Sequence, residues 1–346
     1  MKRVVWHVSS HGWGHAARQR ELLRVFTAVY PQAEVVLATD VPRWFWEGSH
    51  AVSMERGSPS PTVVESGWDI DLAATRTAML SFSQDLERLF HAEVSFQKSI
   101  GPDLVISDMD PLPLAAASAA GIPARAVGNF TWDWVMAELF PDMAERSEKV
   151  AQLHSGSTYL RLPMGPPEVG GFSRVLDVPL LASGPPPDVT GSVSLLPAGP
   201  VCLVALRALP PGGLGPVPEG FKAISSGPSP LGEGIINFPP ERLSREGLHF
   251  SDLVAAADVV ISKAGYGIVS QILSSGSPCV LLCGRGFPEE RYLTAHLEGR
   301  SATVLLYPED YRDLAWAVSL ASGGPLPDRE EACGADFIIQ EGLLDP

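Results

Sequence analysis

The sequence has few basic residues, no paired-cysteine motif and no long apolar run. Its 25 lysines and arginines are outnumbered by 40 aspartates and glutamates, which gives a formal net charge of −15. This balance argues against nucleic acid as a partner, because phosphate binding needs a basic patch. Charge gives no support to peripheral membrane contact either, although such contact stays open. No apolar run reaches the roughly 18 residues that predict a membrane span.

The four cysteines, at positions 202, 279, 283 and 333, show no CxxC spacing. Cys279 and Cys283 flank the apolar run VLL, which is typical of buried core residues. The opening run RVVWHVS is too short for the apolar part of a signal peptide and is typical of a strand. These features together predict a cytoplasmic protein with reduced cysteines.

Apolar strand patterns alternate with helical patterns in both halves of the 346-residue chain. Such alternation predicts a parallel, doubly wound α/β sheet in each half. Strands are expected at 3–9, 34–40, 103–108, 258–262, 279–283 and 302–307. Helices are expected at 15–29, 71–98, 112–120, 250–257, 266–275, 289–298 and 310–321.

The middle of the chain is rich in proline, with 17 of the 32 prolines between residues 163 and 240. Proline at this density predicts a linker and irregular loops. We therefore predict a Rossmann-like domain at 1–165, a Pro/Gly-rich linker region at 166–198 and a second Rossmann-like domain at 199–325. The segment 326–346 follows, and its packing back on the first domain stays open.

The stretch HGWGHAAR follows the first predicted strand and admits several interpretations. Gly12 to Ala17 matches G-x-G-x-x-A, and Asp40 ends the next strand, as in the dinucleotide fingerprint of an NAD(P)-dependent oxidoreductase. His15 argues against this, because a dinucleotide loop needs little side chain where the pyrophosphate approaches. His11 and His15 have the spacing of a metal pair, but the glycines disfavour a continuous helix. A turn with a satisfied polar histidine is the structural alternative.

Carboxylates follow two later strands. The stretch DMD has the DxD spacing of a metal motif, but Asp110 precedes a proline and is typical of a helix N-cap, so no metal site is predicted. Asp108, at a strand end, is a candidate for orienting an acceptor. The stretch NFTWDW brings Asn129, Trp132 and Asp133 to the next strand end. Its indoles either form an acceptor wall or belong to the core.

The stretch SKAGYGIVS places Gly265 and Gly267 at a strand-to-helix turn. Backbone N–H groups and the positive helix N-terminus would bind a phosphate there, and a simple packing turn is the alternative. Glu289 and Glu290 begin a later helix, either as ligands of a donor sugar or as acids that favour the helix dipole. The donor-side candidates are Ser262, Gly265, Tyr266, Gly267, Ser270, Gln271, Glu289 and Glu290.

Four stretches, in chain order, resemble GT-B glycosyltransferases related to the peptidoglycan N-acetylglucosaminyltransferase family. The resemblance is closer to the branch that includes the N-terminal glycosyltransferase-like domain of plant arabinose kinases. It runs from residue 3 to about 320 and is weakest over 140–235. The stretches are HGWGHAAR, 104–134, 250–273 and 278–299.

The resemblance implies two Rossmann-like domains that face each other across a cleft. It implies inverting transfer from a nucleotide-sugar, expected to be UDP-linked, to an unknown acceptor hydroxyl. Because the motifs include no divalent metal site and helix N-termini can bind the phosphates, the transfer is expected to be metal-independent and to need no cofactor. His15 would be the base or an acceptor-positioning residue, with Asp108 and Asp133 as rivals. The implied acceptor-side residues are His11, Gly12, Gly14, Asn129 and Trp132.

Two positions depart from the pattern of such families. Gln271 stands where a carboxylate often binds the ribose hydroxyls, and an amide accepts hydrogen bonds less strongly. The stretch 207–216 replaces the usual glycine-rich turn with Arg207 and prolines, and the helix expected after it is shortened or lost. A non-catalytic nucleotide-sugar-binding protein and a nucleotide-sugar epimerase therefore remain alternatives.

Overall fold

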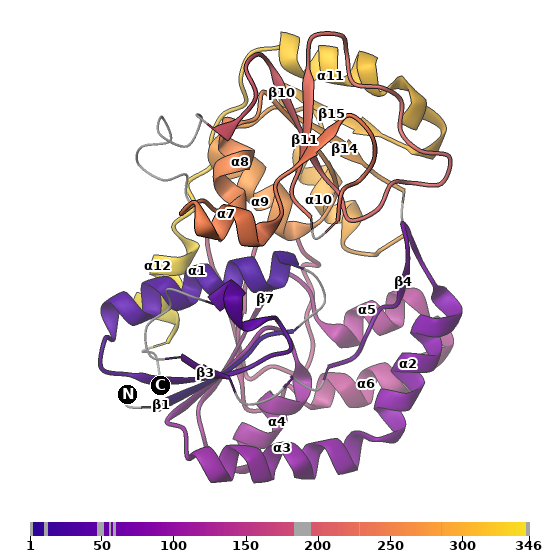
Figure 1. Cartoon of the computed structure of the whole chain (residues 1–346). Coiled ribbons are helices and arrows are strands. Elements are labelled where there is room, and N and C mark those ends of the chain that lie inside the picture. The colour runs from indigo at the N-terminus through magenta and orange to yellow at the C-terminus, as the bar shows by residue number, and fades with distance from the viewer. Residues whose placement is uncertain are drawn as a thin grey trace. The chain divides into compact units, whose positions relative to one another are not determined.

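The chain folds into two compact units, each built on its own parallel sheet (Figure 1). The computed structural model describes residues 3–9, 13–46, 52–54, 57, 60–182, 195–227, 229–284 and 286–343. The N-unit comprises Met1–Val64, Asp71–Leu181 and Cys333–Pro346, and the C-unit comprises Glu65–Ile70 and Ala182–Ala332. The chain therefore passes from one unit to the other four times.

The N-unit contains a seven-stranded parallel sheet. Its strands, in spatial order, are β3 (Val52–Met54), β2 (Glu34–Ala38), β1 (Arg3–His7), β6 (Leu104–Ser107), β7 (Ala124–Gly128), β8 (Thr158–Arg161) and β9 (Arg174–Asp177). β6 and β7 are continuous runs of buried residues, as expected for central strands covered on both faces. The order reverses between β1 and β6, and such sheets bind ligands beyond the carboxyl ends of the strands at this point.

Helices cover both faces of this sheet, with α1 and α3 on opposite faces (Figure 1). The helices are α1 (Trp13–Val29), α2 (Leu72–Gln84), α3 (Leu86–Ile100), α4 (Pro111–Ala119), α5 (Trp132–Leu139), α6 (Ala144–Gln152) and α12 (Gly334–Phe337). Short 3₁₀ segments span Arg43–Trp46 and Pro141–Met143, and a π-helical turn spans Ile338–Gly342.

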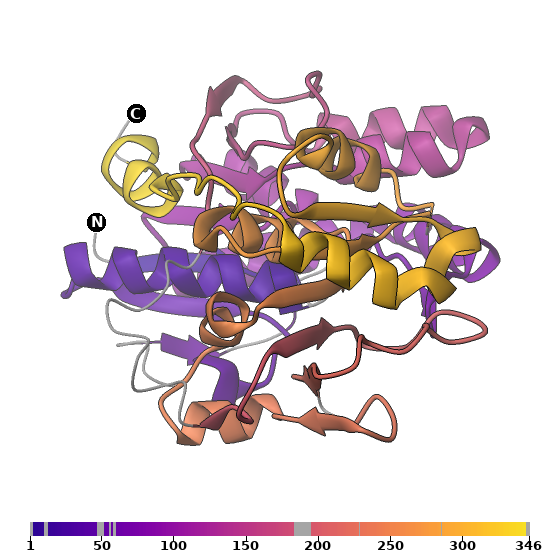
Figure 2. The same ribbon diagram turned by 90° about the horizontal axis from the view of Figure 1, so that it is seen from above.

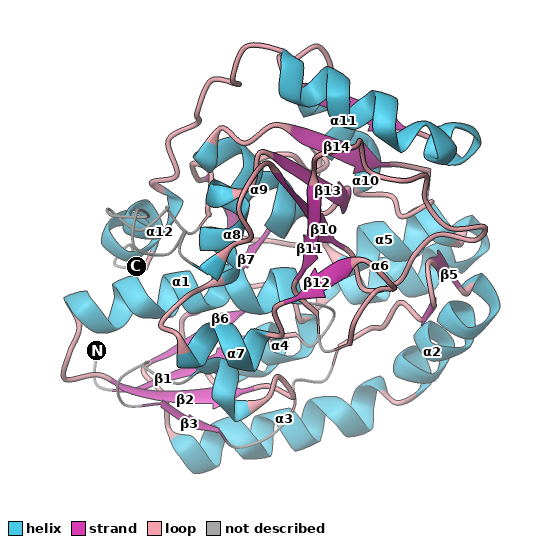
Figure 3. Ribbon diagram, turned by 45° about the horizontal axis from the view of Figure 1, so that its top comes forward, coloured by secondary structure: helices cyan, strands magenta, loops and turns pink. Residues whose placement is uncertain are grey.

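The single helix expected over 71–98 is in fact two helices, α2 and α3 (Figure 3). Asp85 separates them with φ −90° and ψ 0°, and its backbone N–H donates to the Ser81 carbonyl. Aspartate is a weak residue for helix interiors because its side chain competes for backbone groups. The apolar pattern continues through this position, so periodicity alone does not reveal the break.

Part of the predicted linker region is a strand. β9 pairs in parallel with β8, Thr158 opposite Arg174, and forms the edge of the N-unit sheet. An edge strand tolerates exposed side chains and nearby prolines, because one of its sides needs no hydrogen-bonding partner. This strand has neither an alternation of apolar and polar residues nor an apolar run, so the proline-rich composition around it predicted a linker instead.

The C-unit contains a six-stranded parallel sheet and a separate two-stranded hairpin. The sheet order is β12 (Ile235–Asn237), β11 (Lys222–Ser225), β10 (Val201–Ala205), β13 (Val259–Lys263), β14 (Cys279–Leu282) and β15 (Thr303–Leu306). The hairpin strands are β4 (Glu65–Ser66) and β5 (Asp69–Ile70). The sheet order reverses between β10 and β13, so their carboxyl ends mark the second place where a ligand is expected.

Helices complete the C-unit. They are α7 (Pro240–Arg245), α8 (Phe250–Ala256), α9 (Tyr266–Ser275), α10 (Glu290–Leu297) and α11 (Leu314–Gly323), with a 3₁₀ segment at Pro308–Asp313. Figure 2 shows α11 lying along the strands of this sheet. The fully described stretch between β10 and β11 contains no helix, so the loss predicted from its prolines is confirmed. None of the helices in the described ranges is both long and apolar enough to cross a membrane.

Cys279 and Cys283 are core residues of the C-unit, as the sequence predicts. Both side chains are fully buried. Burial raises the pKa of the Cys279 thiol to about 11 and that of the Cys283 thiol to about 12. Because both thiols stay protonated at neutral pH, they act as small apolar residues rather than as nucleophiles.

Candidate active site

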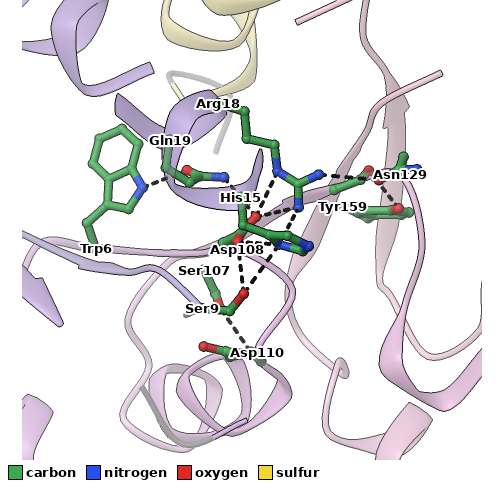
Figure 4. A network of polar contacts seen from close by, with 11 residues as sticks. Trp6, Ser9, His15, Arg18, Gln19, Ser107, Asp108, Asp110, Asn129 and Tyr159 are labelled. Carbon is green, nitrogen blue, oxygen red and sulfur yellow. Dashed lines mark hydrogen bonds and ion pairs between the residues drawn. The ribbon is translucent and has the colours of Figure 1, made fainter. Parts of the chain in front are cut away.

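A cluster of polar side chains lies at the carboxyl ends of β1 and β6 in the N-unit (Figure 4). His7 and Ser107 end the two strands in paired parallel register, so the residues that follow them lie close together. Ser9 follows β1, and Asp108 follows β6. Their side chains are joined by a hydrogen bond of 3.3 Å from Ser9 Oγ to Asp108 Oδ2.

Three side chains of α1 also contact Asp108. His15, Arg18 and Gln19 have i, i+3 and i+4 spacing, which places them on one face of the helix. The Nδ1 atom of His15 lies 2.7 Å from Asp108 Oδ2. Gln19 Nε2 donates to Asp108 Oδ1 at 3.0 Å, and Arg18 donates to the same oxygen through Nε at 3.0 Å and Nη2 at 2.5 Å.

Asp108 is ionised although it is fully buried. Burial by itself raises the pKa of this carboxyl, but the electrostatic attraction and hydrogen bonds of Arg18 and His15 outweigh it and hold the pKa well below its usual range. The side chain of Arg18 is itself buried, with 3% exposure. Arg18 and Asp108 therefore form a buried ion pair, in which neither charge has water as a substitute partner.

The contact with Asp108 determines which nitrogen of His15 is available. A carboxylate can only accept hydrogen bonds, and Asp108 Oδ2 lies nearer to Nδ1 than the guanidinium donor Arg18 Nη2, which is 3.1 Å away, so we assign the proton to Nδ1 as the donor to Asp108 Oδ2. In the neutral imidazole the lone pair then lies on Nε2. The side chain of His15 is 16% exposed. The arrangement can therefore accept a proton at Nε2 and stabilise the resulting imidazolium with Asp108.

The turn after Asp108 has a strained backbone. Met109 has φ 65° and is fully buried. A Cβ atom at Gly128 would lie 2.2 Å from the Cγ of Met109, so glycine is needed there to admit this side chain. A residue other than glycine in this region costs about 1–3 kcal/mol, and such strain is concentrated at functional sites. The turn directs Asp108 into the polar cluster and lets the next residue begin α4.

Asp110 is the N-cap residue of α4, followed by Pro111 at its first position. The helix start predicted from the Asp-Pro step is therefore confirmed. Figure 4 shows the Asp110 side chain turned away from the contacts made by Asp108. The described part of the chain contains no group of three or more His, Cys, Asp or Glu side chains placed to hold a metal ion.

Aromatic rings border His15. The ring of Phe130 lies 6.0 Å from the imidazole, and that of Trp134 lies 6.4 Å from Phe130. Trp132, which the sequence placed on the acceptor side, is only 2% exposed and has no face open to a sugar. The half-buried Trp134 fits that role better. Asp133, one of the rival bases, lies 3.8 Å from the buried His154.

The structure places the other predicted acceptor-side residues in different surroundings. Asn129 is 1% exposed, and its Oδ1 accepts from Arg18 Nη1 at 3.3 Å, so it holds the network instead of facing solvent. Gly14 lies in the first turn of α1. His11 and Gly12 lie outside the described residues.

Most of the predicted donor-side residues lie near the end of β13 or in the first turns of α9. Gly265 is its N-cap residue and has no side chain to bond the first N–H groups. Ser262 Oγ donates to the Ala205 carbonyl at 3.0 Å, and Ser270 Oγ donates to the Gly267 carbonyl at 3.1 Å. These hydroxyls are therefore engaged with the backbone. Gly267 lies within the first turn of α9, and Tyr266 and Gln271 are buried at 3% and 7% exposure.

Glu289 and Glu290 differ from each other. Glu290 Oε1 accepts from the Gly284 backbone N–H at 2.6 Å, so this carboxylate holds the loop after β14. Glu289 is the N-cap residue of α10, its side chain makes no capping hydrogen bond, and it is 7% exposed. Because the structure gives the two acids different surroundings, they should differ in their effect on a ligand.

We expect Glu289→Gln to weaken binding of an intact nucleotide-sugar about 10- to 100-fold while leaving UDP binding unchanged. A hydrogen bond from a sugar hydroxyl to a charged group contributes roughly 1.5–3 kcal/mol, which corresponds to that range. Glu290→Gln, the matched control, should change both ligands alike or neither. Calorimetric titration of both ligands against both variants measures this. Equal weakening of UDP and nucleotide-sugar by Glu289→Gln would contradict a role in sugar binding.

Sequence reasoning missed several residues of these sites. It noted Arg18 only as part of a motif, and it did not connect Gln19 or Ser9 with Asp108. The i, i+3 and i+4 spacing from His15 was the signal that could have found the α1 residues. It also missed Lys263, a cation at the carboxyl end of β13, directly before the glycine turn.

Comparison with known proteins gives a distant sequence relative and several structural ones. No protein-family model matches the chain. The L-arabinokinase of Arabidopsis thaliana is 28% identical to it over 313 residues, which cover 85% of this chain. The match covers only 29% of that protein.

Several solved structures of glycosyltransferases resemble this chain. The glycosyltransferase of kitacinnamycin superposes with a TM-score of 0.58 at 15% identity, covering 97% of this chain and 92% of that one. Arabidopsis thaliana UGT89C1, complexed with UDP, gives 0.56 at 13% identity, covering 93% and 91%. VinC, in complex with dTDP, gives 0.53 at 14% identity, covering 93% and 94%. The chain therefore has the GT-B glycosyltransferase fold.

Proposed function

We propose that this protein transfers a sugar from a nucleotide-sugar, with UDP as the preferred nucleotide, to the hydroxyl of an acceptor, with inversion at the anomeric carbon. The observation that carries the proposal is the 2.7 Å contact between His15 Nδ1 and the buried, ionised Asp108. It supports a general base because, with the proton assigned to Nδ1, the lone pair of the neutral imidazole lies on Nε2. The GT-B fold and the complexes of similar folds with UDP and dTDP support a nucleotide-sugar donor.

In the proposed reaction, His15 Nε2 accepts the proton of the acceptor hydroxyl as its oxygen attacks the anomeric carbon. The bond from that carbon to the diphosphate oxygen breaks, and the electron pair leaves with the nucleoside diphosphate. Asp108 stabilises the imidazolium that forms, and Arg18 and Gln19 keep the carboxylate in place. The Phe130 and Trp134 rings supply an apolar surface next to His15 for the acceptor.

The C-unit supplies the proposed donor site. The N–H groups at the start of α9, where the N-cap Gly265 supplies no side chain, and the partial positive charge of the helix stabilise the departing diphosphate. Lys263, two residues before the N-cap Gly265, and Arg207, two residues beyond β10, add positive charge at the carboxyl ends of paired strands. Developing negative charge is thus met by groups already in place, which is the main source of such catalysis.

A single substitution tests the donor site. At Gly265 the backbone has φ −151°, and a Cβ atom would meet nothing within 4 Å, so a side chain fits. Gly265→Asp should keep the fold, since aspartate is a good N-cap residue, while its charge repels a phosphate. We expect UDP and UDP-sugars to raise the melting temperature of the wild type and of Gly265→Ala, but not that of Gly265→Asp.

The same experiment separates the alternatives. NAD and NADP should give no melting shift, and the UDP shift should persist in EDTA, since the proposed phosphate contacts are backbone and basic groups. A shift with NAD but not UDP would favour an oxidoreductase. Binding of a UDP-sugar without any turnover across an acceptor screen would favour a non-catalytic binding protein, and consumption of the donor without acceptor would favour an epimerase.

A further inference from the structure

The hairpin formed by β4 and β5 belongs to the C-unit, although α2, directly after it, belongs to the N-unit. Trp68, in its turn, is 7% exposed and joins the core cluster of the C-unit. Its ring packs edge-on against Tyr311, with centroids 5.9 Å apart. The hairpin is therefore anchored to the C-unit by an aromatic side chain buried in its core.

The residues that flank the hairpin, Val64 and Asp71, belong to the N-unit and are joined by hydrogen bonds. The Asp71 backbone N–H donates to the Val64 carbonyl at 2.9 Å, and the Val64 N–H donates to Thr75 Oγ1 at 2.9 Å. Asp71 also caps α2 by accepting from the Ala74 N–H at 2.8 Å. The hairpin thus has fixed ends, and Glu65 is its first residue.

Glu65 contacts a cation of the proposed donor site. Its Oε1 accepts a hydrogen bond from Lys263 Nζ at 2.9 Å, and each side chain is 33% exposed. Glu65, Lys263 and Arg207 line one small depression, together with Trp68 and Leu206. The carboxylate of Glu65, from the hairpin, therefore forms an ion pair with Lys263, next to the glycine turn that starts α9.

We propose that Glu65 is a built-in competitor of the donor diphosphate for Lys263, so that the hairpin sets donor affinity. This inference rests on the proposed function, because it takes the ligand of Lys263 to be a nucleoside diphosphate. An ion pair exposed to this degree is weak, whereas a diphosphate carries more charge and also gains the N–H groups of α9. The diphosphate therefore displaces Glu65 and pairs with Lys263.

Competition of this kind predicts that removing the carboxylate tightens binding. We expect Glu65→Gln to lower the Kd for UDP about 2- to 5-fold, the range set by an exposed ion pair. Glu219→Gln removes the same charge from an exposed site of the C-unit and should leave the Kd within experimental error. Lys263→Gln should raise the Kd, and Glu65→Gln should have no further effect when combined with it.

Isothermal titration with UDP of the full chain and these four variants provides the test, with circular dichroism to verify folding. An unchanged or higher Kd for Glu65→Gln, while the wild type binds UDP, contradicts the competition and leaves the proposed function intact. The same holds if Glu65→Gln still tightens binding in the Lys263→Gln background, since the effect would then not act through Lys263. If neither the wild type nor any variant binds UDP or a UDP-sugar, the proposed function and this inference both fail.

Discussion

His15→Ala is expected to lower kcat by about 10²- to 10⁴-fold, the contribution of a positioned general base. The imidazole is the group whose Nε2 can take the acceptor proton, and alanine cannot replace it. The Kd for UDP should stay within about twofold, because the proposed nucleotide contacts come from residues of the C-unit. Initial-rate kinetics with a nucleotide-sugar, combined with calorimetric titration of UDP, measures both quantities.

The matched control is His91→Ala, which removes an exposed histidine of α3 in the same unit and should leave kcat unchanged. Asp133 is the rival base, so Asp133→Asn should be measured in parallel. A fully active His15→Ala enzyme would exclude His15 as the base. If His15→Ala kept full activity while the kcat of Asp133→Asn fell about 100-fold, the base would be Asp133.

Asp108→Asn is expected to be the most destabilising of these substitutions, lowering the free energy of unfolding by about 3–5 kcal/mol. The amide keeps the shape of the side chain but removes its charge, and the buried guanidinium of Arg18 then has lost its charged partner. Turnover should fall as well, because no carboxylate remains to stabilise the imidazolium of His15. Urea unfolding followed by circular dichroism measures the stability change.

The control for Asp108→Asn is an ion pair of the same type at the surface. Asp142 pairs with Arg76, and both side chains are exposed, at 64% and 40%. Asp142→Asn should therefore lower the free energy of unfolding far less than Asp108→Asn does, because water solvates both charges of the surface pair. Equal losses for the two substitutions would show that burial of the Arg18–Asp108 pair does not matter to stability.

The contribution of Asp108 should also depend on pH in a definite direction. Its pKa in the folded protein lies well below the unfolded value of about 3.9. The carboxylate therefore stabilises the fold fully above that unfolded value, and this stabilisation is lost as pH falls further toward the folded pKa. The stability difference between the wild type and Asp108→Asn should be constant near neutral pH and narrow below about pH 4.

The fold could be predicted from the sequence because its strongest signals are local. Strand runs such as 103–108 and 279–283 alternate with helical patterns, and the short distance from each strand to its helix leaves few topologies. The glycine turn before α9 was likewise visible, because a strand, a glycine and a helix follow in order. The likeness to GT-B enzymes used these same local stretches.

The polar network and the hairpin could not be predicted in the same way. The bonds from Arg18 and Gln19 to Asp108 join residues about 90 positions apart, and only the folded sheet brings them together. Trp68 lies in a stretch without strand periodicity, so nothing local indicates that it packs against Tyr311. Long-range pairing of this kind depends on the complete three-dimensional arrangement of the unit.

The order of the chain makes the larger segment of the C-unit an insertion within the N-unit. The Gly334 N–H donates to the Leu180 carbonyl at 2.9 Å, so the chain leaves the N-unit and re-enters it at adjacent points. After re-entry, Ile338 and Ile339 are buried in that unit. During synthesis the N-unit therefore cannot complete its core until about 150 residues of the C-unit have been made. A chain that ends at Leu181 would lack the last part of that core. A chain in which Leu181 is joined directly to Cys333 would keep it, and the two joined residues lie close together in the fold.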